Sequence, residues 1–385
     1  MKIAALVPID SDLWRARRVL ITGHTGFKGA WLSLWLQSLG AHVVGLAPGA
    51  PTRPSLFELA RVGDHMTQHA ADIRDAQAVQ EVVRAEQPEV VFHLAAQPMV
   101  RRSLREPAMT YEVNVMGTVN VLEAVRLAGG EVRAVVIVTS DKCYENDGSH
   151  QGVDGSRWSG FVESDRLGGR DPYSSSKACA ELVAGAYRSS FFGDAGTPEV
   201  ASARAGNVIG GGDWGEDRLL ADAVRAVQAG SPLRVRNPSA IRPWQHVFCA
   251  LTGYVLLAQR LWEGSCPAGA WNFGPPREEA GSVQWIVQEL ARLWDGALRW
   301  EPDRRAAPPE ASYLAIDSMA SERELGWVPP LSLEAALELL VAWHRAAAGG
   351  ADMRAVSLEQ LDGLATRPAG PARPVGPARI VPGGP

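Results

Sequence analysis

Three side chains in two short motifs have the types and spacing to oxidise an alcohol. Tyr173 and Lys177 lie four residues apart in the run YSSSK, which places them on one face of a helix. A nearby ammonium group favours the phenolate and lowers the pKa of a tyrosine from its reference value of about 10. Ser140, in the run TSDK, adds a hydroxyl that shares the transferred proton. We therefore predict Ser140, Tyr173 and Lys177 as catalytic residues.

Two more titratable residues follow Ser140 directly. Asp141 and Lys142 supply an acid and a base that a plain alcohol oxidation does not need, which indicates a second proton-transfer step. As a base, Lys142 must be neutral, so burial or a neighbouring cation has to lower its pKa. The alternative is a structural ion pair between the two residues. Only four lysines occur among 38 basic residues, which favours a functional role for Lys142.

A glycine-rich run, TGHTGFKG, predicts a dinucleotide-binding loop between a strand and a helix. Gly23 permits the tight turn, Gly26 lets the backbone approach a pyrophosphate, and Gly29 allows close packing of helix on strand. The helix N-terminus then faces the anion. A glycine turn without a ligand is the alternative. We interpret Lys28 in this run as a solvated or phosphate-adjacent charge.

Further cofactor contacts are expected at the ends of later strands. Asp72 is placed to accept a hydrogen bond from an adenine amine, or it caps the next helix in competition with Asp75. The small residues of HLAAQ leave space for a flat ring, or for close helix–sheet packing. The predicted cofactor-binding residues are Gly23, Thr25, Gly26, Phe27, Gly29, Asp72, Ile73, Leu94, Ala95, Ala96, Gln97, Asn114, Thr139, Tyr173 and Lys177.

The end of the second strand does not distinguish NAD from NADP. A carboxylate there would bind the ribose 2′-hydroxyl of NAD, but the run at 45–49 reads GLAPG. Arg53 follows a few residues later and either meets a 2′-phosphate or faces solvent. Both cofactors stay open from this loop.

The second half of the chain concentrates arginines beside aromatic residues. Several forked guanidinium groups near an apolar region fit a substrate that carries a diphosphate, although any one of them is equally a surface residue. His246 and Trp244 are placed to flank the sugar or base of such a substrate. The predicted substrate-binding residues are Asn207, Arg218, Arg236, Arg242 and His246.

Short apolar runs that alternate with helical patterns must position these groups. Uniformly apolar strands of this kind indicate a parallel sheet covered on both faces. We predict an α/β fold with a doubly wound, Rossmann-type sheet and a smaller C-terminal substrate-binding lobe. The expected strands are 17–22, 42–46, 89–95, 133–140 and 200–204, and the expected helices are 27–39, 75–86, 107–127 and 172–191.

Composition suggests four parts along the chain. We assign residues 1–16 to an N-terminal extension and 17–206 to a dinucleotide-binding domain that holds the catalytic residues. Residues 207–348 form mainly the substrate-binding lobe, with segments that return to the sheet. Residues 349–385 are a tail, and we expect disorder from about 366, where Pro, Gly, Ala and Arg dominate.

The overall composition excludes several classes of protein. A net charge of −5 gives no electrostatic footprint for a nucleic acid or an anionic membrane surface. No apolar run approaches the roughly 20 residues that a spanning helix needs. Four scattered cysteines form neither a disulfide framework nor a metal knuckle, so we predict no metal. We expect a cytoplasmic enzyme.

With these motifs assembled, the chain resembles the extended short-chain dehydrogenase/reductases and, more narrowly, the CDP-glucose 4,6-dehydratases. The resemblance runs from about Arg18 to Trp343 and includes the stretch from Leu325 to Leu337. The motifs that carry it are TGHTGFKGAWL, PSLFELA, HLAAQPMVR, NVMGTVN, TSDKCYEN, GGRDPYSSSK, RAGNVIGGGDW, NPSAIRPWQHV and WNFGP. SDKCY and IRPWQHV are more specific than the motifs shared by the superfamily.

The resemblance implies a three-stage reaction on CDP-glucose with NAD as cofactor. Tyr173, with Lys177 and Ser140, would oxidise C4, Lys142 would remove the C5 proton, and Asp141 would protonate the departing C6 hydroxyl. Hydride would return to C6, giving CDP-4-dehydro-6-deoxy-D-glucose, a precursor of deoxysugars in polysaccharides. The resemblance also implies that Asn207, Arg218 and Arg242 hold the diphosphate.

Some features depart from the family or leave alternatives. The stretch from Glu145 to Trp158 looks longer and more polar than the loop in this family. A nucleotide-sugar 4-epimerase would share Tyr173 and Lys177 without needing an acid–base pair, and a non-catalytic dinucleotide sensor is a further alternative. Helices 107–127 and 172–191 carry apolar residues on more than one face, so we expect a homodimer or a dimer of dimers.

Overall fold

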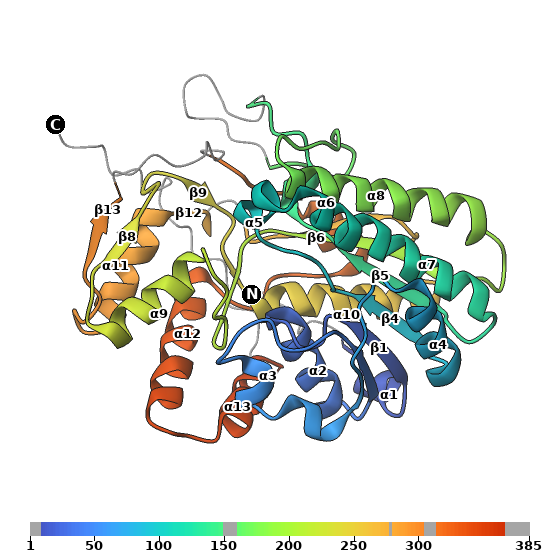
Figure 1. The fold of residues 1–385 in the computed structure, drawn as a ribbon, viewed down its shortest axis with the longest axis horizontal. Coiled ribbons are helices and arrows are strands. Elements are labelled where there is room, and N and C mark those ends of the chain that lie inside the picture. Colours follow the sequence, from blue (N-terminus) through green and yellow to red (C-terminus); the bar gives the residue numbers. More distant parts are fainter. Residues whose placement is uncertain (1–8, 149–159, 277–278, 304–312, 366–385) are drawn as a thin grey trace, which may run out of the picture.

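A seven-stranded parallel sheet forms the centre of the computed structural model (Figure 1). The structure describes residues 9–148, 160–276, 279–303 and 313–365. The strand order is β11-β6-β5-β4-β1-β2-β3, with every neighbouring pair parallel. The chain therefore enters the sheet at β1 and winds outward on both sides, as in a doubly wound fold. The strands are β1 (Arg18–Thr22), β2 (His42–Leu46), β3 (Thr67–His69), β4 (Val90–His93), β5 (Ala134–Val138), β6 (Glu199–Ala205) and β11 (Ala270–Phe273).

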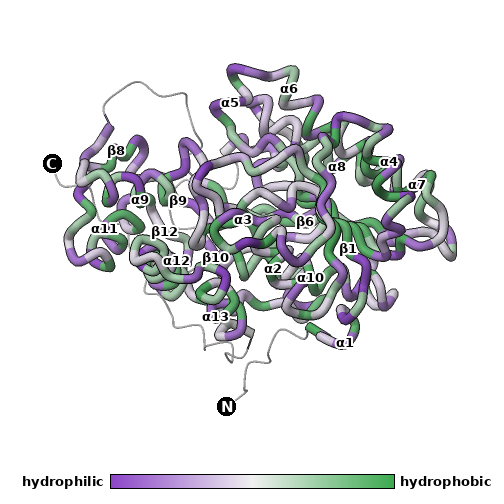
Figure 2. Tube along the Cα trace, turned by 60° about the horizontal axis from the view of Figure 1, so that its bottom comes forward, coloured by the Kyte–Doolittle hydropathy of each residue, from purple (hydrophilic) through white to green (hydrophobic). Residues whose placement is uncertain are grey.

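The central strands are buried on both faces, which explains their uniformly apolar sequences. All five residues of β5 are buried, and alternate side chains of β1 enter different cores. Val19 and Ile21 face one side of the sheet, whereas Leu20 faces the other. Figure 2 shows the strands around β1 as a hydrophobic interior. The predicted α/β fold class is confirmed.

Two layers of helices cover this sheet (Figure 1). Apolar residues of α4 (Ala76–Glu86), α7 (Gly117–Ala128) and α8 (Pro172–Phe191) form the core on one face. Those of α2 (Phe27–Ser38) and α10 (Val247–Glu263) form the core on the other face. Shorter elements connect these layers: α3 (Leu56–Leu59), η1 (Val62–His65), α5 (Val100–Arg105), η3 (Asp141–Cys143) and η5 (Ser321–Leu325).

The second lobe has an apolar core of its own. Val224, Trp244, Ile286 and Leu337 pack together in it. Its helices are α9 (Leu219–Ala229), α11 (Val283–Leu293) and α12 (Leu333–Ala348). Three small sheets complete it: β7 (Val208–Ile209) with β10 (Gln245–His246), β9 (Ile241–Arg242) with β12 (Gly281–Ser282), and β8 (Leu233–Val235) with β13 (Trp300–Pro302).

Parts of the predicted N-terminal extension and C-terminal tail form helices that pack on the rest of the protein. Helix α1 (Ser11–Trp14) places Trp14 fully inside the core of the first domain. Residues assigned to the tail form α13 (Met353–Ala365), where the Ser357 hydroxyl accepts a hydrogen bond from Trp343 Nε1 at 2.9 Å. Helix α1 has only four residues, and the tail was assigned from its composition, so the packing of both segments became visible only in the structure. Residues from 366 onward, expected to be disordered, lie outside the described residues.

The predicted helix at 107–127 contains a π-helical turn. The structure divides this stretch into α6 (Pro107–Tyr111), η2 (Glu112–Met116) and α7. Such turns insert an extra residue into a helix and occur frequently at functional sites. Here the turn carries Asn114, one of the predicted cofactor-binding residues. No helix within the described ranges is long and apolar enough to cross a membrane.

Candidate active site

The glycine loop joins β1 to α2 in a geometry that leaves no room for side chains. Gly23 has φ +75°, and a Cβ atom there would lie 2.7 Å from the backbone nitrogen of Ala95. A Cβ at Gly29 would lie 2.1 Å from the carbonyl oxygen of Gly23. Gly26 is the N-cap of α2 and provides no side-chain cap, so the first-turn N–H groups are available to an anion. This cradle fits the pyrophosphate of a dinucleotide.

The other predicted contacts near this loop lie around the same strand ends. Thr25 Oγ1 donates a hydrogen bond to the carbonyl oxygen of Gly49 at 2.7 Å. Other predicted residues are half-buried after β4 and at the start of α2. The segment after β4 is joined to the end of β1, because Ala95 N donates to Thr22 Oγ1 at 3.2 Å. These half-buried residues are Phe27, Leu94, Ala95 and Ala96. Their contacts with a cofactor stay a prediction.

Asn114 connects the end of β4 to helix α8. Its Oδ1 accepts from Gln97 N at 2.7 Å, and its Nδ2 donates to Ser176 Oγ at 2.8 Å. Because both ends of the amide are engaged, the contacts seen here position the surrounding elements. Gly117, directly after η2, packs closely on Ile73, another predicted cofactor-binding residue. A Cβ atom at Gly117 would lie 2.4 Å from Ile73 Cδ1.

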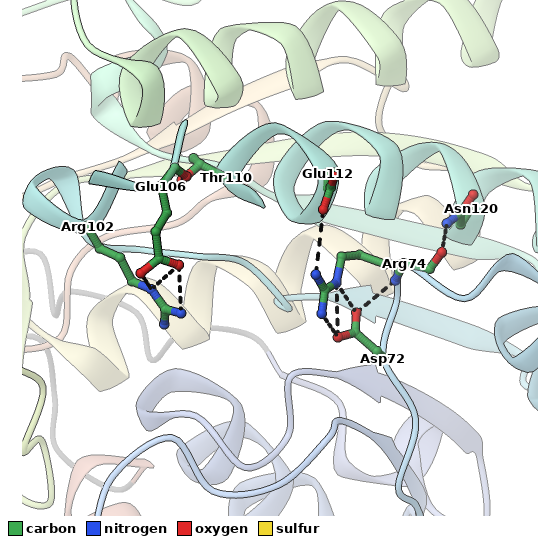
Figure 3. A network of polar contacts seen from close by, with 7 residues as sticks. All are labelled: Asp72, Arg74, Arg102, Glu106, Thr110, Glu112 and Asn120. Atoms are coloured by element: carbon green, nitrogen blue, oxygen red, sulfur yellow. Dashed lines mark hydrogen bonds and ion pairs between the residues drawn. The ribbon is translucent and has the colours of Figure 1, made fainter. Parts of the chain in front are cut away.

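Asp72 is held by an arginine two residues later (Figure 3). Its carboxylate accepts from Arg74 Nη2 at 2.8 Å, and this guanidinium holds the pKa of Asp72 below its usual range. Arg74 also pairs with Glu112 of η2 at 3.6 Å (Figure 3). Asp75, not Asp72, is the N-cap of α4. The helix-cap alternative for Asp72 is therefore wrong, and its contact with adenine stays a prediction.

Tyr173 and Lys177 project from the first turns of α8 into the protein interior. Burial raises the pKa of Tyr173 to about 12, although hydrogen bonding with Ser140 lowers it. Burial lowers the pKa of Lys177 to about 8, and its Nζ donates to the carbonyl oxygen of Val138 at 3.1 Å. We expected the ammonium group to lower the pKa of Tyr173. That expectation is wrong in this structure because loss of water around the phenol outweighs the favourable contacts.

Asp141 is a buried acid beside this pair. Burial raises its pKa, while the charges of Lys142, Arg242 and Lys28 oppose the shift. Its Oδ1 accepts from Ser140 Oγ at 2.9 Å, and its Oδ2 is buried with no hydrogen-bond partner. Within the described residues no ion pair joins Asp141 to the half-buried Lys142. The structural ion pair considered as an alternative is therefore not formed.

A buried carboxylate that we did not predict organises the base of the site. Glu181 accepts hydrogen bonds from Thr139 Oγ1, from Ser202 Oγ at 2.6 Å and from Arg204 Nη2 at 2.8 Å. Glu181 lies four residues after Lys177 on the same helix face, and that spacing was the available signal. Thr139, predicted to bind cofactor, therefore has its hydroxyl engaged by the protein.

Lys28 is the second residue whose place the sequence did not reveal. It lies half-buried in the first turn of α2, with Nζ 3.4 Å from the Tyr254 hydroxyl. Burial and the nearby charges of Lys177 and Arg218 lower its pKa to about 7, while Asp141 opposes the shift. Lys28 is therefore enclosed near Lys177, Arg218 and Asp141, so the solvated alternative is wrong, whereas its place beside a phosphate stays a prediction.

Among the predicted substrate-binding arginines, two are close to the predicted catalytic residues. Arg218 Nη1 pairs with Asp213 Oδ2 at 2.7 Å, and its charge lowers the pKa of Tyr173. Arg242 is buried, and its charge lowers the pKa of Asp141. The second lobe therefore presents guanidinium groups to the ends of the central strands.

The other three predicted substrate-binding residues contact the protein itself in different ways. Asn207 is half-buried, and its carbonyl oxygen accepts from Gln245 N at 3.0 Å. Arg236 pairs with Asp217 at 3.5 Å. His246 is only 1% exposed, caps α10 by accepting from Phe248 N, and lies edge-on to Trp31; burial lowers its pKa to about 3. His246 is thus a helix cap in this structure, and its contact with a sugar stays a prediction.

Sequence comparison identifies the family. The family described as GDP-mannose 4,6 dehydratase matches residues 20–262, more than half of the chain. The chain belongs to this family. A CDP-glucose 4,6-dehydratase from Salmonella typhimurium is 48% identical over 92% of this chain and 97% of its own length. The predicted resemblance is confirmed.

More distant relatives include both dehydratases and epimerases. A UDP-glucose 4-epimerase from Mycolicibacterium smegmatis is 30% identical over 85% of this chain and 98% of its own length. The structure is also similar to that of DesIV, a dTDP-glucose 4,6-dehydratase from Streptomyces venezuelae solved with NAD and TYD bound. That match has a TM-score of 0.71 and 25% identity, and covers 88% of this chain and 99% of the other.

Proposed function

We propose that this family member is a CDP-glucose 4,6-dehydratase, an NAD-dependent hydro-lyase that converts CDP-D-glucose to CDP-4-dehydro-6-deoxy-D-glucose and water. The observation that carries the proposal is the buried carboxyl group of Asp141 beside Tyr173 and Ser140. An acid in that place is needed for elimination, not for oxidation alone. The 48% identity to the Salmonella enzyme supports CDP-glucose as the substrate.

The first stage is assigned to Tyr173, with Ser140 and Lys177. Tyr173 accepts the proton of the C4 hydroxyl, and the Ser140 hydroxyl shares that proton through its hydrogen bond. While it is protonated, Lys177 on the same helix face favours the phenolate form of Tyr173, which accepts this proton. NAD, when bound, would supply the hydride acceptor for C4 and the hydride donor for C6.

The second stage is assigned to Lys142 and Asp141. Lys142 removes the C5 proton, made acidic by the neighbouring C4 ketone, and Asp141 donates its proton to the C6 hydroxyl, which leaves as water. Burial supports this role for Asp141 because the raised pKa keeps the carboxyl group protonated to higher pH. A proton then returns to C5, so one water is lost without net oxidation.

The cofactor is proposed to be NAD, held by the glycine loop and the ends of β1 and β4. The positions of Gly23, Gly26 and Gly29 fit a pyrophosphate on the helix N-terminus. Asn207, Arg218 and Arg242 are proposed to hold the diphosphate of the substrate. Arg218 lowers the pKa of Tyr173 and Arg242 lowers the pKa of Asp141, so both arginines lie close to the proposed catalytic residues, which supports that role.

Purified protein incubated with CDP-glucose and NAD tests the proposal. We expect a product lighter by one water, with no net use of NAD, and no such product from dTDP-glucose, GDP-mannose or UDP-glucose. Water loss from another of these substrates would correct the base specificity. A C4 epimer without water loss would overturn the proposal in favour of the epimerase, which the relative from Mycolicibacterium makes the second candidate.

We also propose that the enzyme is a homodimer, or a dimer of dimers, in the cytoplasm. Large apolar side chains of α5, α6, η2 and α8 are exposed on this single chain, which favours a second copy as their cover. They are Leu104, Tyr111, Met116, Leu182 and Phe191. All four cysteines are unpaired, as suits a reducing compartment. Sedimentation equilibrium showing a monomer at micromolar concentration would contradict the dimer.

A further inference from the structure

A polar cavity of about 350 Å³ lies at the border between α5 and the second lobe. Its wall includes Arg101, from the first turn of α5, and Arg236, which follows β8. Asp217, in the loop before α9, lies between them. Its Oδ1 accepts from Arg101 Nη1 at 3.2 Å and from Arg236 Nη1 at 3.5 Å. One carboxylate oxygen thus joins two guanidinium groups that come from different lobes.

These contacts are weak enough to exchange. The side chains of Arg101 and Asp217 are each 32% exposed, and half-exposed ion pairs of this length stabilise a fold little. Asp217 also has φ +55°, in the left-handed region that disfavours most residues other than glycine, asparagine and aspartate. An anion that binds the two arginines more strongly can therefore replace the Asp217 carboxylate at little cost.

Arg101 also has a donor that the carboxylate does not satisfy. Its Nε is buried with no hydrogen-bond partner among the described residues. A buried donor without an acceptor costs free energy, so such groups usually have a partner in the working state. A diphosphate carries more acceptor oxygens than a carboxylate and suits the forked guanidinium better.

The same loop also places an arginine near Tyr173. Arg218 follows Asp217, pairs with Asp213 and lies close enough to Tyr173 to lower its pKa. Both arginine sites of the loop are therefore occupied by protein carboxylates. The cavity lies one residue along the chain from a group that acts on the catalytic tyrosine.

We propose that Asp217 occupies an anion site formed by Arg101 and Arg236, and that the diphosphate of the nucleotide-sugar displaces it on binding. The inference rests on the proposed function and adds Arg101, from the first domain, to the substrate-binding residues. Asp217 then lowers substrate affinity, because the incoming anion competes with a carboxylate of the protein itself.

Binding of CDP to full-length protein with NAD present, measured by isothermal titration calorimetry, tests this proposal through two variants with opposite expected signs. Asp217→Asn removes the competing charge, and asparagine tolerates the left-handed backbone, so CDP should bind about three- to tenfold more tightly. Arg101→Gln removes a donor to the diphosphate, so CDP should bind about tenfold more weakly. A purely structural ion pair predicts instead that both variants lower thermal stability and that neither tightens binding.

Two matched controls exist in the chain. Arg102→Gln changes the neighbouring arginine, which pairs with Glu106 on the exposed side of α5 (Figure 3). Asp295→Asn changes another aspartate with positive φ in an ion pair, with Arg345, outside the cavity. Both controls should bind CDP as the unmodified protein does.

The outcomes separate this inference from the proposed function. If the protein dehydrates CDP-glucose but Asp217→Asn does not bind CDP more tightly, the inference is wrong and the function stands. Weaker binding in both variants also overturns the inference. If the unmodified protein neither binds CDP nor dehydrates CDP-glucose, both proposals fail.

Discussion

The two sets of charged residues that meet at the active site are held in different ways. At the ends of the central strands, Lys177 donates to a backbone carbonyl and Glu181 accepts three hydrogen bonds, all inside the protein. In the loops of the second lobe, Arg218 and Arg236 form ion pairs with aspartates and are partly exposed. The first set is held by buried partners, whereas the second set includes Arg236, whose partner Asp217 is the carboxylate that we propose to be exchangeable.

This difference matches the demands of catalysis and of binding. Proton transfer needs donors and acceptors at fixed positions with shifted pKa values, and burial provides both. Binding of an anion needs cations whose partners can be replaced without unfolding the protein. The same residue types therefore serve different purposes according to what surrounds them.

The largest effect should come from the fixed set. Tyr173→Phe removes the group that accepts the C4 proton, so kcat should fall about 10²–10⁴-fold. The rate of water loss from CDP-glucose measures it. Tyr187→Phe, on the same helix and bonded to Glu123, is the matched control and should keep its activity. Equal losses in both variants would mean that α8 was merely disturbed.

Glu181→Ala should break the buried network. The side chains of Glu181 and Arg204 are only 3% and 4% exposed, so removing the carboxylate leaves a buried guanidinium without its partner. We expect a loss of about 3–5 kcal/mol in the free energy of unfolding, measured by denaturant titration. Glu289→Ala, which breaks an exposed pair with Arg292, should cost less than about 1 kcal/mol. Similar losses in the two variants would contradict the conclusion that burial makes the Glu181 network important for stability.

Arg218→Gln should affect binding more than chemistry. Losing one guanidinium at the diphosphate should raise KM about tenfold, with a smaller change in kcat. Steady-state kinetics with CDP-glucose separates the two constants, and Arg292→Gln on the exposed surface serves as the control. A large fall in kcat alone would place Arg218 among the fixed catalytic groups.

The smallest expected effect concerns pH. Burial lowers the pKa of Lys28 to about 7 and of Lys177 to about 8, so both lose their charge as the pH rises from 6 to 9. Loss of these charges should lower kcat/KM if they assist catalysis, whereas the same rise in pH favours the deprotonated form of Tyr173 that accepts the C4 proton. Lys28→Arg keeps its charge, so the ratio of kcat/KM for this variant to that for the unmodified protein should rise a few-fold between about pH 6 and 9. A ratio that stays constant over this range would contradict a role for the Lys28 charge.

Several features of this protein follow from the sequence alone. The bounds of β2 and α8 match their predicted ranges because a buried strand and a helix with a proline start have clear local signals. Gly23 and Gly29 were also recognised from a local signal, because glycines at this spacing indicate that the end of β1 and the start of α2 approach each other closely. Asp141 and Lys142 were selected from their chemistry beside Ser140, and their roles as acid and base stay a prediction.

Only the tertiary structure decided how these groups behave. Whether Lys28 is solvated or enclosed depends on Tyr254, 226 residues away, and the raised pKa of Tyr173 depends on how much water the folded chain excludes. The π-turn that presents Asn114 has no local signature in the sequence. Motifs specify which groups are available, but a pKa is set by all the charges and solvent around a group, and only the folded chain brings these together.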